Sequence, residues 1–296
     1  MSHSSPDYTV VTPEVLRGWR LPEPTGGKEG RGSILVVAGS RETLGAALLA
    51  AEGALRAGAG KLQVATAESV GGLAAAALPE ALVRALPETE GGVIRADAAD
   101  AVRDLAVKAD AVLIGPGMEN KEETQGFAER LLPHLTGPLA LDALALACIT
   151  ADPACVHHLE GRVVLTPNPK ELAIALHVEQ PQVDDDPAGS ATDLAKRAHA
   201  TVGLGGVMSW IANPDGELWR DDSGSAGLGV SGSGDVRAGI TAGLLARGAA
   251  PEQAAVWAAY LHGRAGERLA SSMGPLGFLA REVPAEVPRA LAEIAS

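Results

Sequence analysis

The sequence predicts an α/β fold in which a mainly parallel central sheet is flanked by helices on both faces. A continuous apolar run at 33–38 (SILVVA) lacks polar alternation, so it indicates a strand that is buried on both faces. An Ala-rich helical stretch at about 45–57 and a second strand at 61–66 follow it, which makes a βαβ unit. Aromatic residues make up only 3% of the chain while Ala and Gly abound, and this composition favours close packing of helices on the sheet.

Residues 1–30 are polar and interrupted by prolines, so we expect an irregular amino-terminal arm there. Within the arm, Thr12 followed by Pro13 has the form of a short helix start. We expect the arm to wrap around the outside of the fold or to join a subunit contact. Nothing in the sequence is rich enough in Gly, Ser or Pro to mark a linker, so we expect a single domain over 1–296.

Three further apolar strands are expected at 111–114, 139–142 and 163–166, each ending in a turn with Gly, Pro or a polar residue. The carboxyl ends of parallel strands share one edge of a sheet, and α/β proteins bind their ligands at that edge. The residues that this rule places together are Gly39, Gly117, Asp142 and Asn168. Turn chemistry explains each of them alone, but their shared position favours a functional interpretation.

In the second half of the chain, the carboxylates at 184–186 precede a proline. We expect a solvated loop followed by a capped helix there rather than a metal site, because no other ligand pattern accompanies them. The stretches 209–213 and 217–220 flank Pro-Asp-Gly, which predicts a β-hairpin. A long helix is expected from Pro251 onward.

The stretch 229–239 (GVSGSGDVRAG) is interpreted as a glycine-rich turn that opens a helix. The unpaired amides and positive dipole end of a helix start favour phosphate oxygens. Gly232 and Gly234 let the main chain approach an anion closely. A carboxylate beside a bound phosphate repels it, so Asp235 is better explained as a general base for a hydroxyl group. The alternative is that Asp235 only caps the helix.

Charge and composition exclude several classes of partner. The 24 Lys and Arg against 37 Asp and Glu give a net charge of −13, which repels nucleic acid and anionic membranes. Cys148 and Cys155 lack metal-ligand spacing and are expected to be reduced thiols. His157, His158 and His262 have no companion at ligand spacing and are interpreted as structural or surface residues. Because no apolar span or signal-like start is present either, we expect a cytoplasmic protein without nucleic-acid or membrane partners.

Six motifs in order carry a resemblance to a known family. They are 31–66 (RGSILVVAGSRETLGAALLAAEGALRAGAGKLQVAT), 78–81 (LPEA), 110–118 (DAVLIGPGM), 139–146 (LALDALAL), 163–172 (VVLTPNPKEL) and 227–248 (GLGVSGSGDVRAGITAGLLARG). Together they resemble the ADP- or ATP-dependent NAD(P)H-hydrate dehydratases of the ribokinase-like superfamily, and most closely the actinobacterial members. The resemblance covers most of the chain and implies the ribokinase-like fold.

The resemblance also implies a reaction. The substrates are NADHX and NADPHX, nicotinamide cofactors that have taken up water across the ring. ADP or ATP phosphorylates the hydrate's hydroxyl group with the help of Mg²⁺, and phosphate then leaves to restore NADH or NADPH. The resemblance further implies a homo-oligomer, with a tetramer as one form.

The resemblance assigns roles to particular residues. Asp235 is the catalytic base and contacts the hydrate, together with Ala46, Gly117 and Asn168. Asp142 holds Mg²⁺ or the substrate through water, or is simply a turn residue. The nucleotide-binding positions are Gly205, Gly206, Val207, Met208, Ser209, Gly232, Ser233 and Gly234.

The chain departs from the family pattern at several positions. Asn168 stands where the family usually has His, and Lys170 replaces a small residue. Gly205 stands where a lysine usually faces the nucleotide, and Leu144 replaces an Asp or Gly. Two alternatives therefore stay open beside the dehydratase: an ATP-dependent kinase for a small alcohol such as a vitamin precursor, and a nucleotide-binding relative without catalysis.

Overall fold

The computed structural model describes residues 7–23 and 26–295, so part of the predicted arm, 1–6 and 24–25, lies outside the described residues. The strands are β1 (Thr9–Val10), β2 (Ser33–Val37), β3 (Lys61–Ala67), β4 (Ala81–Leu86), β5 (Ala111–Ile114), β6 (Leu139–Leu141), β7 (Val163–Leu165), β8 (Thr201–Leu204), β9 (Ser209–Ala212) and β10 (Leu218–Asp221). The helices are α1 (Pro13–Gly18), α2 (Leu44–Arg56), α3 (Glu68–Ala77), α4 (Ala99–Ala106), α5 (Lys121–Leu131), α6 (Ala147–Ala151), α7 (Pro169–Leu176), α8 (Gln180–Asp185), α9 (Pro187–Ala198), α10 (Ser233–Ala246), α11 (Pro251–Met273) and α12 (Val283–Ala295).

The strands form one sheet in the order β1-β10-β9-β8-β7-β6-β5-β2-β3-β4. Strand β9 is antiparallel to both β8 and β10, and the other neighbouring strands pair in parallel. The prediction of a mainly parallel sheet is therefore confirmed, and so is the hairpin, which is β9 and β10.

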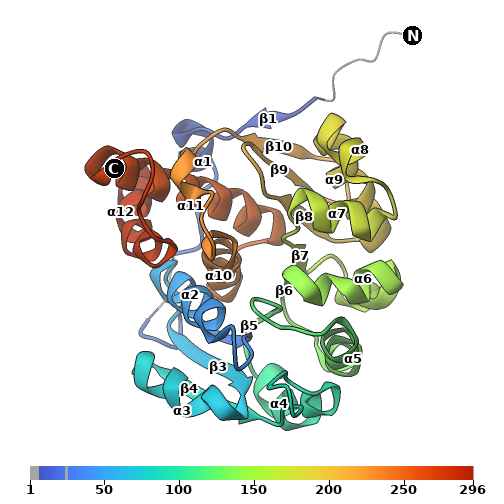
Figure 1. The fold of residues 1–296 in the computed structure, drawn as a ribbon. Helices are drawn as coiled ribbons and strands as arrows, with labels where there is room; N and C mark the ends of the chain where they lie inside the picture. Colours follow the sequence, from blue (N-terminus) through green and yellow to red (C-terminus); the bar gives the residue numbers. More distant parts are fainter. Residues whose placement is uncertain (1–6, 24–25, 296) are drawn as a thin grey trace.

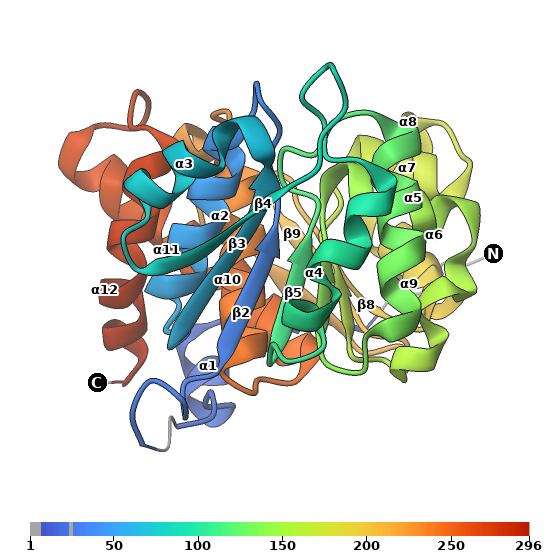
Figure 2. The same ribbon diagram turned by 90° about the horizontal axis from the view of Figure 1, so that it is seen from below.

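Helices cover both faces of the sheet, as predicted (Figure 1). Successive side chains of a strand point to opposite faces, and β2 illustrates this. Leu35 and Val37 pack in the core formed with α4–α7 and α9. Ile34 and Val36 pack in the core formed with α2, α10, α11 and α12. Figure 2 shows the parallel strands between these two layers.

Helices α2 and α10 pack unusually closely because glycine and alanine face each other. A Cβ atom added at Gly239 would overlap the carbonyl oxygen of Ala50, and one added at Gly243 would overlap that of Ala54. Some of the abundant small residues of the sequence therefore lie at the contact between α2 and α10. It allows α10, whose amino-terminal end carries Asp235, to lie directly against α2.

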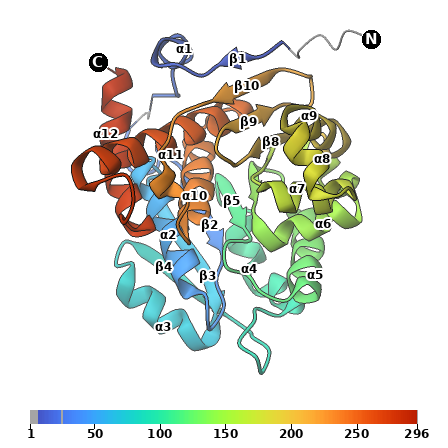
Figure 3. The same cartoon turned by 45° about the horizontal axis from the view of Figure 1, so that its top comes forward.

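The arm is more regular than the sequence predicted. Strand β1 pairs in parallel with β10, and Figure 3 shows β1 and α1 beside β10 at this end of the sheet. Trp19 stacks on Trp219 with 5.7 Å between ring centroids. The carbonyl of Trp19 accepts hydrogen bonds from Gln253 Nε2 at 3.1 Å and Trp257 Nε1 at 3.0 Å. The edge of β10 offers unpaired main-chain groups, and pairing with the arm satisfies some of them.

The acidic run at 184–186 also differs from the expectation. Helix α8 continues to Asp185, so only Asp186 remains outside a helix. The turn before α8 is closed by Glu179 N–H, which donates to Gln182 Oε1 at 3.0 Å, and Val183 is buried. The capped helix was predicted correctly: Asp186 Oδ1 accepts from the Gly189 amide at 2.9 Å at the start of α9.

In the described part of the chain, no helix has the length and apolarity needed to cross a membrane.

Candidate active site

The strand order reverses between β2 and β5, since β3 lies on one side of β2 and β5 on the other. In open α/β sheets this switch point leaves a crevice at the carboxyl ends of the strands. The loops that follow β2 and β5 are joined here: the Gly39 amide donates to the Pro116 carbonyl at 2.8 Å, and the Gly115 amide donates to the Val37 carbonyl at 3.1 Å. The loops that carry Gly39 and Gly117 therefore form one connected part of the predicted edge.

Ala46 and Gly117, both predicted to contact the hydrate, are neighbours in this edge. Gly117 has a φ of +63°, and a Cβ atom there would lie 2.6 Å from the Cβ of Ala46. Thr43 Oγ1 donates to the Gly117 carbonyl at 2.5 Å. Only glycine fits at 117, because both its conformation and its distance from Ala46 exclude a side chain.

The glycine-rich stretch opens α10 as predicted. Gly232 is the N-cap residue with a φ of +89°, and a Cβ atom there would overlap Leu49 of α2. The first helical hydrogen bond runs from the Val236 amide to the Gly232 carbonyl at 3.2 Å, so the amides of Gly234 and Asp235 precede it. The Ser233 amide donates to the Val230 carbonyl at 3.2 Å. Two donors are thus directed out of the helix start, which is the geometry that binds anions.

Asp235 is not the helix cap. It is the third residue of α10, and no side chain makes a capping hydrogen bond at this helix start. Burial, and secondarily the negative charge of Glu171, raise the pKa of Asp235 to about 6. A half-buried carboxylate with a raised pKa and no structural hydrogen bond is suited to accept a proton near neutral pH.

Asp142 lies just after β6, close to this carboxylate. It is 7% exposed and accepts a hydrogen bond from Thr166 Oγ1 at 2.7 Å. Burial raises its pKa to about 8 against the effect of that hydrogen bond, and the negative charges of Glu171 and Asp235 raise it further. The carboxyl ends of β6 and β7 and the start of α10 therefore gather acidic groups into one small volume.

Asn168 has a structural task that sequence reasoning missed. Its Oδ1 accepts from the Glu171 amide at 3.0 Å, and the Asn168 amide donates to Glu171 Oε2 at 2.9 Å. This capping box starts α7. The pattern Asn-Pro-Lys-Glu could have identified it from sequence, since Glu stands three residues after the cap.

Asn168→Ala is expected to lower the free energy of unfolding by about 0.5–2 kcal/mol, because the cap of α7 is lost. Asn168→Ser, which keeps a capping oxygen, is expected to lose little. Chemical denaturation of both variants measures this difference. Equal stability of the alanine and serine variants would contradict the capping role.

The predicted nucleotide-binding residues 205–209 form the connection from β8 to β9. The Gly205 amide donates to the Pro167 carbonyl at 3.0 Å, so this end of the connection lies at the same sheet edge. Val207 is fully exposed at 100% and Met208 is 45% exposed. The connection thus begins beside the other site residues and then projects outward.

Two further residues join this connection to α10. Arg237, which is 9% exposed, donates from Nη2 to the Gly203 carbonyl at 3.1 Å. His262 and Ser233 share a hydrogen bond of 2.9 Å between Nε2 and Oγ. Burial, and then the charge of Arg237, lower the pKa of His262 to about 3, so its imidazole is neutral. His262 was interpreted from sequence as a structural or surface residue, and the structure places it on α11 beside the start of α10.

Comparisons with known proteins agree with this geometry. A family profile described as NAD(P)H-hydrate dehydratase matches residues 34–289. This chain belongs to that family. An ADP-dependent (S)-NAD(P)H-hydrate dehydratase of Xanthomonas campestris is 44% identical over 96% of both chains. A bifunctional NAD(P)H-hydrate repair enzyme of Moorella thermoacetica is 36% identical over 88% of this chain, which spans 49% of that relative.

Solved structures place the family within a larger fold group. The ADP/ATP-dependent NAD(P)H-hydrate dehydratase of Bacillus subtilis, co-crystallised with ATP and Mg²⁺, has a TM-score of 0.82 and 30% identity, covering 97% of this chain and 99% of that one. Ribokinase from Thermotoga maritima shares the fold at a TM-score of 0.53 and 14% identity, covering 86% of this chain and 98% of that one. The predicted ribokinase-like α/β fold is confirmed.

Within this NAD(P)H-hydrate dehydratase fold, the described residues contain no group of three or more His, Cys, Asp or Glu that could hold a metal ion. Mg²⁺ usually takes one or two carboxylates and completes its shell with water and substrate phosphates. Asp142 supplies a carboxylate of that kind at the sheet edge, so the site fits a metal that is held mainly by a nucleotide.

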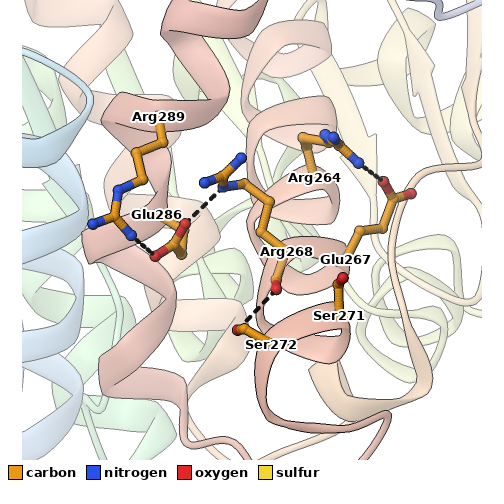
Figure 4. A pocket seen from close by; sticks show the side chains of 7 residues that line it. All are labelled: Arg264, Glu267, Arg268, Ser271, Ser272, Glu286 and Arg289. Atoms are coloured by element: carbon orange, nitrogen blue, oxygen red, sulfur yellow. Dashed lines mark hydrogen bonds and ion pairs between the residues drawn. The ribbon is translucent and has the colours of Figure 1, made fainter.

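A surface hollow of this family member lies on α11 and α12 and is separate from that edge (Figure 4). Its charged lining residues belong to an ion-pair cluster in which Arg268 bonds Glu286, and also Glu293 outside the lining. Arg264 bonds Glu293 at 2.7 Å and Glu267 at 2.8 Å. None of the predicted site residues lines this hollow. The charges of its ion pairs neutralise one another, and these ion pairs join α11 to α12.

Proposed function

We propose that this chain dehydrates NADHX and NADPHX to NADH and NADPH, with ADP or ATP as phosphate donor. The observation that carries the proposal is Asp235, a half-buried carboxylate that is neither the cap of α10 nor engaged in a hydrogen bond of the helix start. It follows a helix start where the Gly234 and Asp235 amides make no main-chain hydrogen bond within the described residues, and Gly232 of that start packs on Leu49 of α2, the helix that carries Ala46. The names of the relatives from Xanthomonas campestris and Bacillus subtilis support the substrate and the nucleotide.

The reaction follows from what each group offers. Asp235 takes the proton of the hydrate's hydroxyl, and that oxygen attacks the terminal phosphorus of the nucleotide. The bond from this phosphorus to its bridging oxygen breaks, which releases AMP from ADP or ADP from ATP. The amides of Gly234 and Asp235 stabilise negative charge on the transferring group. The C–O bond then breaks with its electrons leaving on phosphate, and a proton is lost from the adjacent ring carbon to form the double bond. Asp142 and the nucleotide would hold Mg²⁺, and its charge would offset the negative charge of the phosphate oxygens.

The proposal is tested by incubating the protein with the (S) form of NADHX, Mg²⁺ and either ADP or ATP. Absorbance of reduced nicotinamide and released phosphate are followed together. Equal, nucleotide-dependent increases in both are expected, and they identify the donor. A stable phosphorylated product without reduced nicotinamide would instead indicate a small-molecule kinase, and nucleotide binding without turnover would indicate a binding protein.

The pH profile gives a second test. Because Asp235 must be deprotonated to act and its pKa is raised to about 6, kcat/KM is expected to rise with pH through about 6 and level off above it. Glu171→Gln removes a negative charge that raises this pKa, so its midpoint is expected at lower pH. A profile without a rise between pH 5.5 and 7 would contradict the assignment of Asp235 as base.

We further propose that the protein acts in the cytoplasm as a single domain over 1–296 and as a homo-oligomer, with a tetramer as one form. Two free thiols, Cys148 and Cys155, are consistent with a reducing compartment. Leu276 and Leu279 are 68% and 42% exposed after α11 and would be covered by a subunit contact. Light scattering coupled to size exclusion measures the subunit number, and a monomer would overturn this part.

A further inference from the structure

Arg237 is a buried cation inside the predicted site. It lies in the first half of α10, two residues after Asp235, and is 9% exposed. Burial lowers the pKa of its guanidinium, while the nearby charges of Asp221 and Asp142 raise it. A charge in such a place requires compensation, because burial of an unpaired ion is costly.

The protein itself compensates this cation only in part. Within the described residues, the guanidinium donates one hydrogen bond, from Nη2 to the Gly203 carbonyl at 3.1 Å. The nearby carboxylates are engaged elsewhere. Asp221 accepts from Ser223 Oγ at 2.7 Å and 2.9 Å, and Asp142 accepts from Thr166 Oγ1 at 2.7 Å. Neither Nε nor Nη1 donates a hydrogen bond to another residue in the part of the chain that the structure describes.

The Nη1 donor faces the start of the connection from β8 to β9. A Cβ atom added at Gly205 would lie 2.8 Å from Nη1, and one added at Gly203 would lie 3.4 Å from Nη2. The guanidinium fills the space that a side chain at 205 would take. The absence of a side chain at Gly205 is thus what lets Arg237 reach the sheet edge.

Acidic side chains surround the place where a phosphate group of the nucleotide would lie. Asp142, Asp235 and Glu171 interact electrostatically with one another at this edge. Asp221 adds a fourth carboxylate beside Arg237. A phosphate group carries further negative charge, so it needs a cation in the same place. Arginine suits this task because its fork of donors matches phosphate oxygens.

We infer that Arg237 binds a phosphate group of the nucleotide at the carboxyl end of β8, and that Gly205 is small in order to make room for it. The inference rests on the proposed function only in taking ADP or ATP as the ligand. It assigns to one side chain of α10 the positive charge that the 205–209 connection itself lacks.

The test measures ADP and ATP binding directly by calorimetry, without hydrate and without turnover. Arg237→Met is expected to weaken binding by roughly 10- to 100-fold, as for loss of a charged hydrogen bond. Arg237→Lys keeps the charge and loses the forked arrangement of donors. Its ADP affinity is expected to lie between those of the unaltered protein and Arg237→Met. Arg247→Met is the matched control, because Arg247 ends the same helix and donates to the Ala57 carbonyl at 2.8 Å, so its ADP affinity should equal that of the unaltered protein.

A rescue separates binding from a purely structural role. In Gly205→Lys/Arg237→Met, a cation returns to the same space from the connection between β8 and β9. The ADP affinity is therefore expected to recover to within a few fold of that of the unaltered protein. A helix-anchoring role for Arg237 would not be restored in this way. Thermal melts of each variant, with and without ADP, show whether weak binding comes from unfolding.

The outcomes distinguish the two proposals. Unchanged nucleotide affinity in folded Arg237→Met would overturn the role of Arg237 and leave the dehydratase untouched. Suppose that Arg237→Met binds ADP more weakly, while the unaltered protein binds ADP but does not dehydrate NADHX. That result would support the role of Arg237 and overturn the dehydratase. An unaltered protein that binds neither ADP nor ATP would overturn both.

Discussion

Asp235→Asn is expected to abolish dehydration of NADHX while the protein stays folded. The amide occupies the same volume but cannot take the hydroxyl proton, and loss of a general base typically costs about 10²- to 10⁴-fold in rate. Asp235 caps nothing and its charged form is disfavoured by burial, so the substitution removes no stabilising contact that the helix start depends on. The measurement is kcat with ADP and Mg²⁺, together with a thermal melt.

Two controls isolate the proton transfer. ADP affinity of Asp235→Asn should be equal to or tighter than that of the unaltered protein, because a negative charge near phosphate has been removed. Glu171→Gln removes the negative charge that raises the pKa of Asp235 but keeps an acceptor for the Asn168 amide, so this variant should stay active. Full activity of Asp235→Asn would show that the mechanism is wrong.

Gly239→Ala is expected to lower the stability of the protein markedly. The new Cβ atom would overlap the carbonyl oxygen of Ala50, which is main chain and cannot turn away as a side chain could. Overpacking of this kind costs about 1–3 kcal/mol, and α10 must move away from α2. Activity should fall as well, because that shift separates the Asp235 turn from Ala46. Urea and thermal unfolding measure the loss.

Gly45→Ala is the matched control on the facing helix α2. A Cβ atom at Gly45 meets nothing within 4 Å, and alanine is the better helix former, so stability should be retained or slightly raised. Equal melting temperatures for Gly239→Ala and Gly45→Ala would contradict the close α2–α10 contact.

Local sequence patterns determined the main architecture of this protein. The apolar run before the Ala-rich helix predicted β2, α2 and β3 to within one residue at each boundary. A buried parallel strand must be apolar throughout, and its crossover must be helical, so the pattern and the structure have one cause. The motif at 229–239 likewise predicted a glycine turn and a helix, because both depend on neighbouring residues only.

Only the tertiary structure decided how the site is supplied with charge and hydrogen bonds. From sequence, Arg237 is a charged residue in a mainly apolar helix, and only the structure places Gly203 and Gly205 beside its guanidinium. His262 had no partner in sequence, yet α11 brings it to Ser233. Strand β1 was missed for the same reason, since its partner Trp219 lies far along the chain. Burial, close approach and pairing between distant segments arise from packing, and no local pattern records them.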